Sequence, residues 1–259
     1  MKKIISILLS VIILCTAFSA CSMNDGVKEN GETGKTEIIR PVVKENHSVD
    51  KIKASDGKVS YILDVTLPEI TDNLPEDVAE HINQFIDLIR EEALRSAEAN
   101  AEYAREYMIE HGSKTPWQRT ITFETVYSTD KYLSVEFTDR FTMLGGETTP
   151  TVYAKLFELE NGTVLSLENL AKVNKDELKD ALVDLIIKEA DSKYYSDGTK
   201  LDEKQKQAIA ESYNPFNFCY SSRGITLYLN KLVVDHSYSG TLCCEFTFSE
   251  LRNVIERLK

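Results

Sequence analysis

The pattern of apolar and polar positions is most informative between residues 141 and 169. Thr148–Glu160 alternates apolar and polar side chains as a half-buried strand does, and the double glycine Gly145-Gly146 precedes it. Asn161-Gly162 separates this strand from the short apolar run Val164–Leu167. Because Asn and Gly tolerate the positive φ of two-residue hairpin loops, the pattern predicts a β-hairpin.

The same alternation predicts strands on both sides of this hairpin. Asp56-Gly57 predicts a tight turn inside the first strand pair, and the segment that begins at Pro68 is expected to end that pair. We expect the strands before residue 144 to form one meander. The predicted strands are Ile52–Ala54, Lys58–Leu67, Arg119–Ser128, Tyr132–Met143, Phe216–Tyr220, Gly224–Leu229, Lys231–Val234 and Thr241–Phe248.

Helical periodicity begins near Pro75, where the first turn of a helix accepts proline. Apolar residues recur at helical spacing from Val78, and the pattern predicts one long helix that ends at His111-Gly112, where glycine takes the left-handed cap. Alanines on the buried stripe of its second half indicate that this half either packs closely against a sheet or stands partly free. Shorter helices are predicted from Asn174 to Lys193, from Asp202 to Ser212 and from Ser249 to Lys259. The fold class is therefore α+β, with antiparallel sheets packed against a long helix and shorter helices.

The first twenty residues are typical of a secretory signal peptide. Lys2 and Lys3 precede an apolar run, and small residues then lead to Cys21. The segment resembles a bacterial lipobox, in which the cysteine is acylated, although Phe18 replaces the usual leucine. The sequence therefore predicts lipidation of Cys21 and an anchor on the outer face of the cell membrane. The alternatives are an uncleaved anchor or an ordinary signal peptide with an incidental cysteine.

Residues 21–44 are rich in Gly, Asn, Glu, Lys and Ser, a composition typical of a flexible tether. We therefore divide the chain into a signal peptide (1–20), a lipoprotein tether (21–44), an N-terminal hairpin and long-helix module (45–115) and an α+β domain (116–259).

The chain is acidic, with 42 Asp and Glu against 30 Lys and Arg and a formal net charge of −12. Loss of Lys2 and Lys3 with the leader would bring the mature charge to about −14. Such a surface repels nucleic acid and attracts cationic partners. Its other interpretation is simple solubility.

Candidate chemistry is sparse. The four histidines are scattered, no Cys or His spacing indicates zinc, and neither a nucleotide-binding glycine loop nor a nucleophile elbow occurs. Asp235-His236-Ser237 is a run of neighbours, whereas a catalytic triad is assembled in space. We therefore expect no cofactor, no metal and no catalytic activity.

Three cysteines remain after the anchor. On alternating strands Cys219 and Cys243 face away from the neighbouring aromatic residues, whereas Cys244 shares their face. Three packed thiols are one interpretation, and a Cys219–Cys243 disulfide is the other.

A resemblance rests on the order of several short segments. Leu144-Gly145-Gly146, Thr148-Thr149 and Tyr153, then Asn161-Gly162-Thr163 and the stretch 165–170, resemble the RsiV C-terminal-type domain of unknown function (domain of unknown function 3298). The closing segments Phe216-Asn217-Phe218, 224–229, 236–240 and 249–251 are similar to the end of that domain. The resemblance covers about residues 50–259, including the preceding 4163-type module.

The resemblance implies an α+β fold outside the membrane. This family occurs in anti-sigma factors that bind lysozyme and beside peptidoglycan or polysaccharide deacetylase domains. Here Glu147 stands in a loop that is two residues shorter and lacks the family's histidine, and no anti-sigma or deacetylase segment is evident, so neither full activity is expected.

We therefore expect an extracytoplasmic, lipid-anchored binding or sensor module that recognises a lysozyme-like cationic protein or a peptidoglycan or wall glycan. The alternative is a structural or accessory surface lipoprotein that acts through protein partners. The predicted ligand contacts lie in two loops that strand aromatics flank. They are Gly145, Gly146, Glu147, Thr148, Thr149, Tyr153, His236 and Tyr238.

Overall fold

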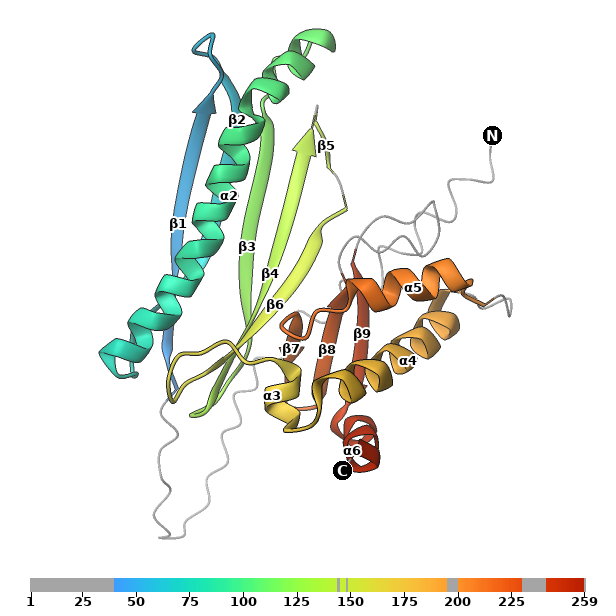
Figure 1. Ribbon diagram of the computed structural model, residues 1–259. Helices are drawn as coiled ribbons and strands as arrows, with labels where there is room; N and C mark the ends of the chain where they lie inside the picture. The colour runs from blue at the N-terminus through green and yellow to red at the C-terminus, as the bar shows by residue number, and fades with distance from the viewer. Residues whose placement is uncertain (1–39, 144, 148, 195–199, 230–240, 259) are drawn as a thin grey trace, which may run out of the picture. The chain divides into compact units, whose positions relative to one another are not determined.

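The computed structural model describes residues 40–143, 145–147, 149–194, 200–229 and 241–258 (Figure 1). It has the predicted α+β class, with a six-stranded sheet, a three-stranded sheet, one long helix and shorter helices. Each sheet has a hydrophobic core of its own.

The first sheet has the order β1-β2-β3-β4-β5, and β6 also pairs with β4. All neighbouring strands are antiparallel except β2 and β3, which run parallel because the long helix α2 connects them. The expectation of a single meander is therefore wrong at this connection, where a crossover helix replaces a hairpin. The strands are β1 (Val42–Lys53), β2 (Val59–Asp72), β3 (Trp117–Ser128), β4 (Tyr132–Met143), β5 (Gly146–Glu147) and β6 (Thr151–Glu158).

The first hairpin turns where the Asp56-Gly57 dipeptide predicts, and Gly57 has a φ of 77°. The prediction that Pro68 ends the pair is wrong, because β2 continues to Asp72. Beyond Val65, β2 has no pairing with β3, and the side chain of Asn83 bonds both the N–H and the C=O of Ile70 at that edge. Pro68 lies two residues before Ile70, so its backbone faces the same edge of β2. The N–H that proline lacks would point to this edge and is not needed for pairing with β1.

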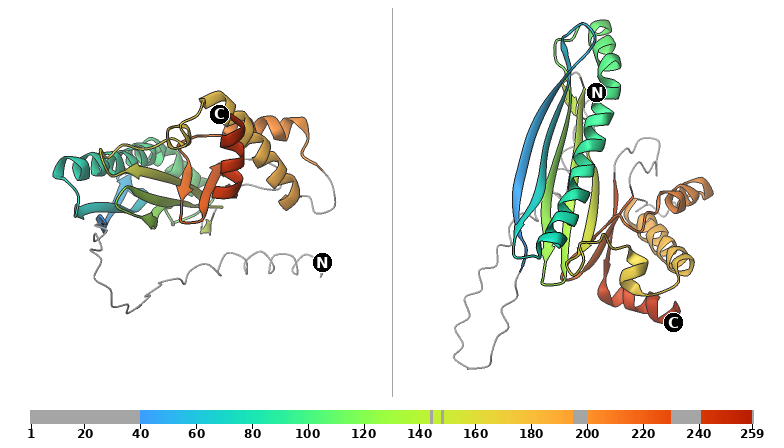
Figure 2. Two further views of the ribbon diagram at one scale, coloured as in Figure 1. Left: turned by 90° about the horizontal axis from the view of Figure 1, so that it is seen from below. Right: turned by 60° about the vertical axis from the view of Figure 1, so that its left-hand side comes forward.

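Helix α2 (Glu76–Glu110) packs against the first sheet (Figure 2). Its buried stripe narrows from Val78, Ile82 and Ile86 to Ala93, Ala97, Ala101 and Ala104, which lets its second half approach the strands closely, the first of the two arrangements that the sequence left open. Gly112 has the expected left-handed conformation, with a φ of 63°. The N–H of Ser113 bonds the carbonyl of Met108 across it and closes the helix.

The second sheet contains β7 (Phe218–Tyr220), β8 (Gly224–Leu229) and β9 (Leu242–Thr247) in that order. Helices α3 (Leu167–Ala171), α4 (Lys175–Tyr194), α5 (Glu203–Ser212) and α6 (Phe248–Leu258) accompany it. Asn174 caps α4 and Asp202 forms a capping box at α5, as predicted. The cap of α6 is Thr247 instead of Ser249, because Thr247 and Glu250 exchange the two capping hydrogen bonds. The predicted strand at 231–234 lies outside the described residues.

The central hairpin is shorter than predicted on its return side. Val164 alone forms a bridge, with Phe157, and Leu167 begins α3. Gly162 has a φ of 76°, whereas Asn161 keeps a negative φ, so the connection is not a two-residue hairpin loop. The N–H of Gly162 instead bonds the carbonyl of Glu158, which makes a wider turn.

A buried polar network joins the two sheets. Asn217 accepts a hydrogen bond from the N–H of Ala154 in β6 at 2.9 Å and donates to the carbonyl of Tyr228 in β8 at 2.8 Å. Ser134 of β4 accepts from the N–H of Tyr220 at 2.9 Å and lies 3.4 Å from the thiol of Cys219.

Cys219 and Cys243 are reduced thiols in this structure. Cys219 pairs with Thr226 and Cys243 with Tyr228, so the two cysteines lie on strands that flank β8. Strands two apart are separated by about 10 Å, which exceeds the reach of a disulfide. The disulfide alternative is therefore not realised, and the faces of the three cysteines are as predicted.

The predicted boundary between residues 115 and 116 falls between α2 and β3, inside the first sheet. The change from one hydrophobic core to the other comes later in the chain, within β6, where Phe157 belongs to the first core and Leu156 to the second.

Candidate functional site

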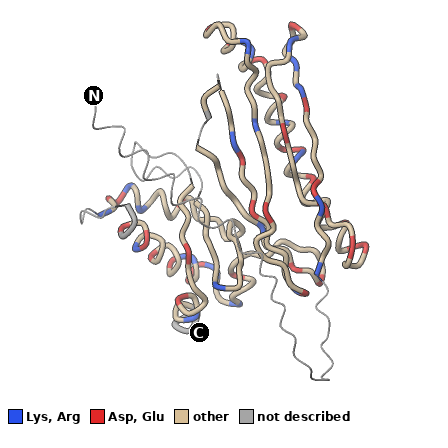
Figure 3. Tube along the Cα trace, turned by 180° about the vertical axis from the view of Figure 1, so that it is seen from behind, with Lys and Arg blue, Asp and Glu red and all other residues tan. Residues whose placement is uncertain are grey.

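The most distinctive exposed feature is the solvent face of α2. All ten acidic residues of this helix are exposed, and the only basic residues among its 35 positions are Arg90, Arg95 and Arg105. Figure 3 shows the acidic positions recurring along the helix. The acidic residues are Glu76, Asp77, Glu80, Asp87, Glu91, Glu92, Glu98, Glu102, Glu106 and Glu110.

Two of these arginines are turned towards the first hairpin. Arg105 is largely covered and bonds Asp56 at 2.8 Å, and this hydrogen bond holds the pKa of Asp56 below its usual value. Arg90 is half-buried and donates to the side-chain oxygen of Asn46 at 3.0 Å. Only Arg95 stays exposed, where it pairs with Glu92. The outer face of α2, which we call the acidic face, therefore keeps most of its negative charge uncompensated.

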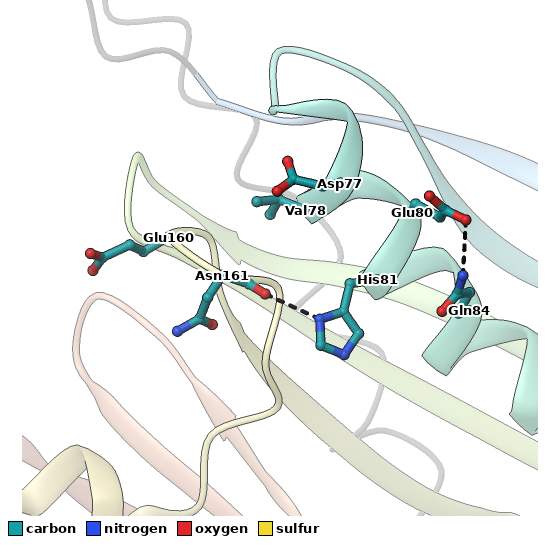
Figure 4. Close-up of a pocket in the computed structure, with 7 residues that line it drawn as sticks. All are labelled: Asp77, Val78, Glu80, His81, Gln84, Glu160 and Asn161. Atoms are coloured by element: carbon teal, nitrogen blue, oxygen red, sulfur yellow. Dashed lines mark hydrogen bonds between the residues drawn. The ribbon is translucent and has the colours of Figure 1, made fainter.

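An open recess of about 540 Å³ lies at the N-terminal end of the acidic face (Figure 4). His81 turns its Nδ1 towards the carbonyl of Asn161 at 3.2 Å, and this contact requires a proton on Nδ1. Carboxylates from two parts of the chain line the recess. The lining residues are Asp77, Val78, Glu80, His81, Gln84, Glu160 and Asn161.

The turn that borders the recess is held tightly against α2. A Cβ added to Gly162 would lie 2.9 Å from the carbonyl oxygen of Val78 and 3.1 Å from the Cβ of His81. The recess therefore has a fixed wall of backbone, and its polar rim and acidic charge suit a cationic group.

Of the ligand contacts predicted from the sequence, Gly145, Gly146, Glu147 and Thr149 lie at the end of β4. Gly145 has a φ of 80°, and Gly146 and Glu147 pair with Met143 and Thr142 as the short strand β5. The N–H of Val152 bonds Thr241 Oγ1 at 3.0 Å, so the start of β6 lies beside the residue that follows the second predicted loop.

Tyr153 is packed into the sheet face and does not extend from a loop. Its ring stacks on Phe137 with centroids 5.1 Å apart, and burial raises the pKa of its hydroxyl. Arg119 and Asp139 form a two-pronged ion pair nearby, with the shortest contact at 2.6 Å. The ion pair links β3 to β4. Thr148, His236, Tyr238 and Cys21 lie outside the described residues.

The interior polar groups of Glu136, Tyr228 and Cys219 lie between the two sheets. Tyr228 donates a hydrogen bond to Glu136 between the sheets, and burial raises the pKa of both groups. Burial also raises the pKa of Cys219 to about 11, so this thiol stays protonated at neutral pH. Within the described ranges no three His, Cys, Asp or Glu side chains gather in a way that could hold a metal ion. The described helices also lack one that is long and apolar enough to cross a bilayer.

The acidic face of α2 is not among the ligand contacts predicted from the sequence. The signal was present in the ratio of acidic to basic residues along the helix. The inward placement of Arg90 and Arg105 depends on tertiary contacts, and only the structure shows it.

The arrangement of two sheets, one crossover helix and a capping helical layer defines the class of the fold. No family model and no curated protein sequence matches the chain. Several solved structures match the fold, and two of them are DUF3298 family proteins. One, from Bacteroides fragilis, has a TM-score of 0.56 and 11% identity, and the match covers 85% of this chain and 97% of that one. The other, from Pseudomonas aeruginosa, has a TM-score of 0.53 and 11% identity, with 82% and 93% covered.

Proposed function

We propose that this protein is an extracytoplasmic, lipid-anchored, non-catalytic binding or sensor module that recognises a cationic protein of the cell envelope through the acidic face of α2. The observation that carries the proposal is that ten exposed carboxylates share one helix, whereas two of its three arginines are bonded to the neighbouring hairpin. A lysozyme is the model ligand.

Electrostatics supports a cationic partner. A helix of 35 residues is about 52 Å long, so the acidic face is longer than the roughly 30 Å diameter of a small domain. Uncompensated charge of one sign raises the association rate of an oppositely charged protein. The chain as a whole adds to this field with its net charge of −12.

The fold supports the same class of function. The chain shares its fold with DUF3298 family proteins, and its loop sequences resemble the RsiV C-terminal-type domain, which occurs in lysozyme-binding anti-sigma factors. The recess beside His81 gives the acidic face a concave end, where a lysine or arginine side chain of the ligand would meet Asp77, Glu80 and Glu160.

Anchoring at Cys21 places the module at the membrane surface in this proposal. The motivation is the cysteine that follows an apolar leader and small residues. We expect the wild-type protein to partition into detergent and Cys21→Ala to be released or to stall in processing. Identical processing and retention of Cys21→Ala would contradict the lipid anchor.

Isothermal titration with lysozyme tests the ligand class. We expect saturable binding at about 20 mM salt that weakens at least about tenfold at 0.5 M, because screening shortens the reach of exposed charges. Parallel titration with peptidoglycan fragments tests the glycan alternative. Folded protein that gives no heat with lysozyme at either salt concentration would refute the cationic-protein proposal. If glycan fragments are also silent, the structural or accessory role remains.

A further inference from the structure

The two long edges of the first sheet, β6 and β1, differ in whether other parts of the chain bond their outward backbone groups. At the β6 edge, side chains of Asn217 and Thr241 accept from the N–H groups of Ala154 and Val152, and the N–H of Leu165 bonds the carbonyl of Leu156. This edge is closed to another strand. At the β1 edge, β2 is the only strand that pairs with β1 in the described part of the chain, and no described backbone hydrogen bond from another element reaches its outer side.

The register shows which backbone groups of β1 face outwards. The N–H of Ile70 in β2 donates to the side chain of Asn83, and the C=O of Ile70 accepts from it, so both groups face away from β1. Ile70 and its partner Val43 therefore form a non-hydrogen-bonded pair. The register is regular from Val43 to Ile52, and alternation along it repeats this geometry at every second residue. The outward N–H and C=O groups therefore belong to Val43, Glu45, His47, Val49 and Lys51.

Two common devices that protect an edge strand are missing from this stretch. It contains neither a proline nor a bulge between Val43 and Ile52. Its last four outward residues, from Glu45 to Lys51, are exposed, and Val49 keeps 48% of its surface accessible. A second extended chain could therefore add to the sheet over the length of β1.

The charges of β1 are self-complementary. In an antiparallel pair, outward residues must face outward residues, which requires that the numbers of two opposed residues sum to an even value. The pairing that uses all five outward residues sets His47 opposite His47 of the second copy, Glu45 opposite Val49 and Val43 opposite Lys51. It also sets Lys44 opposite Asp50 twice, at the close, non-hydrogen-bonded positions, where opposite charges stabilise a sheet.

The geometry points to a second copy of this chain as the partner: we propose that β1 pairs antiparallel with β1 of another molecule about a twofold axis at His47. A continuous sheet then runs through the dimer. This surface is separate from the acidic face of α2, so the inference does not depend on the proposed function.

Sedimentation equilibrium of the full chain in density-matched detergent tests the proposal. Val49→Pro removes an outward N–H that β2 does not use, and Val49→Thr keeps it as the matched control. We expect a dimer for wild type and Val49→Thr, and a dissociation constant at least tenfold higher for Val49→Pro. A wild type that stays monomeric up to about 100 μM, or a Val49→Pro dimer of unchanged affinity, overturns the proposal.

Charge reversal tests the register and does not depend on how well Val49→Pro folds. Lys44→Asp alone places a carboxylate opposite Asp50 of the other copy at both symmetry-related positions, and should weaken the dimer at least fivefold. Asp50→Lys alone places an ammonium group opposite Lys44 at the same two positions, and should also weaken the dimer at least fivefold. The double variant Lys44→Asp/Asp50→Lys restores both pairs and should recover wild-type dimerisation. Weakening that is additive in the double variant would overturn the proposed pairing.

Discussion

Asn217 offers the sharpest stability test, because its side chain bonds both sheets from a position that is only 6% exposed. Its amide oxygen accepts from the N–H of Ala154, and its amide nitrogen donates to the carbonyl of Tyr228. Asn217→Ala leaves both backbone groups without these partners. A buried polar group that loses its hydrogen bond costs about 1–3 kcal/mol. We therefore expect the free energy of unfolding to fall by about 2–5 kcal/mol.

Urea denaturation followed by circular dichroism measures this loss as a shift of the midpoint of roughly 1–2 M. Asn169→Ala is the control, since Asn169 is exposed on α3 and its side chain has no hydrogen bond in the described structure. The control should stay within about 0.5 kcal/mol of wild type. If Asn217→Ala is as stable as the control, the polar network does not hold the two sheets together and the reasoning fails.

Two further substitutions test local features. Gly162→Ala should destabilise the fold by about 1–3 kcal/mol more than Gly57→Ala, because both glycines have positive φ but only the Cβ at 162 would meet the backbone of α2. Thermal unfolding measures the two losses of stability, and equal losses would contradict this contact. Glu136→Gln removes a partly buried charge and keeps an acceptor for Tyr228. Because burial raises the pKa of Glu136, wild type gains stability as pH falls through that raised value, so the variant should be at least as stable at pH 8 and should lose this pH dependence. Glu245→Gln, at an exposed position of β9, is its control, and an unchanged pH profile in Glu136→Gln would show that this carboxyl is not responsible.

Much of the secondary structure was predictable because local chemistry fixes it. Asp56-Gly57 makes its turn, Gly112 ends α2 and Asp202 starts α5, each through hydrogen bonds within a few residues. The errors arise where distant contacts decide. Pro68 stays in β2 because Asn83 of α2 hydrogen-bonds the backbone of Ile70 at that edge of the strand. Thr247 caps α6 because Glu250 completes the capping box with it.

The candidate site was less predictable than the fold. Ten carboxylates on one helix are visible in the sequence, but their net effect depends on where Arg90 and Arg105 turn. Tyr153 was predicted as a loop contact from its position after a glycine-bearing segment, and the structure packs it on Phe137. The parallel pairing of β2 with β3 is likewise a consequence of α2 crossing the sheet, which alternation alone does not encode.

The central claim is that the acidic face of α2, and not acidity in general, binds a cationic protein. The direct measurement is the dissociation constant for lysozyme at low salt in two variants with the same change of net charge. One is Asp87→Asn/Glu91→Gln/Glu98→Gln on α2, and the other is Glu177→Gln/Asp180→Asn/Asp184→Asn on α4, all at exposed positions. At about 0.2–1 kcal/mol for each of the three exposed charges, or roughly 0.6–3 kcal/mol together, the α2 variant should bind at least about threefold more weakly than wild type. The α4 variant should stay within about twofold of wild type, and equal weakening in the two variants would contradict the claim.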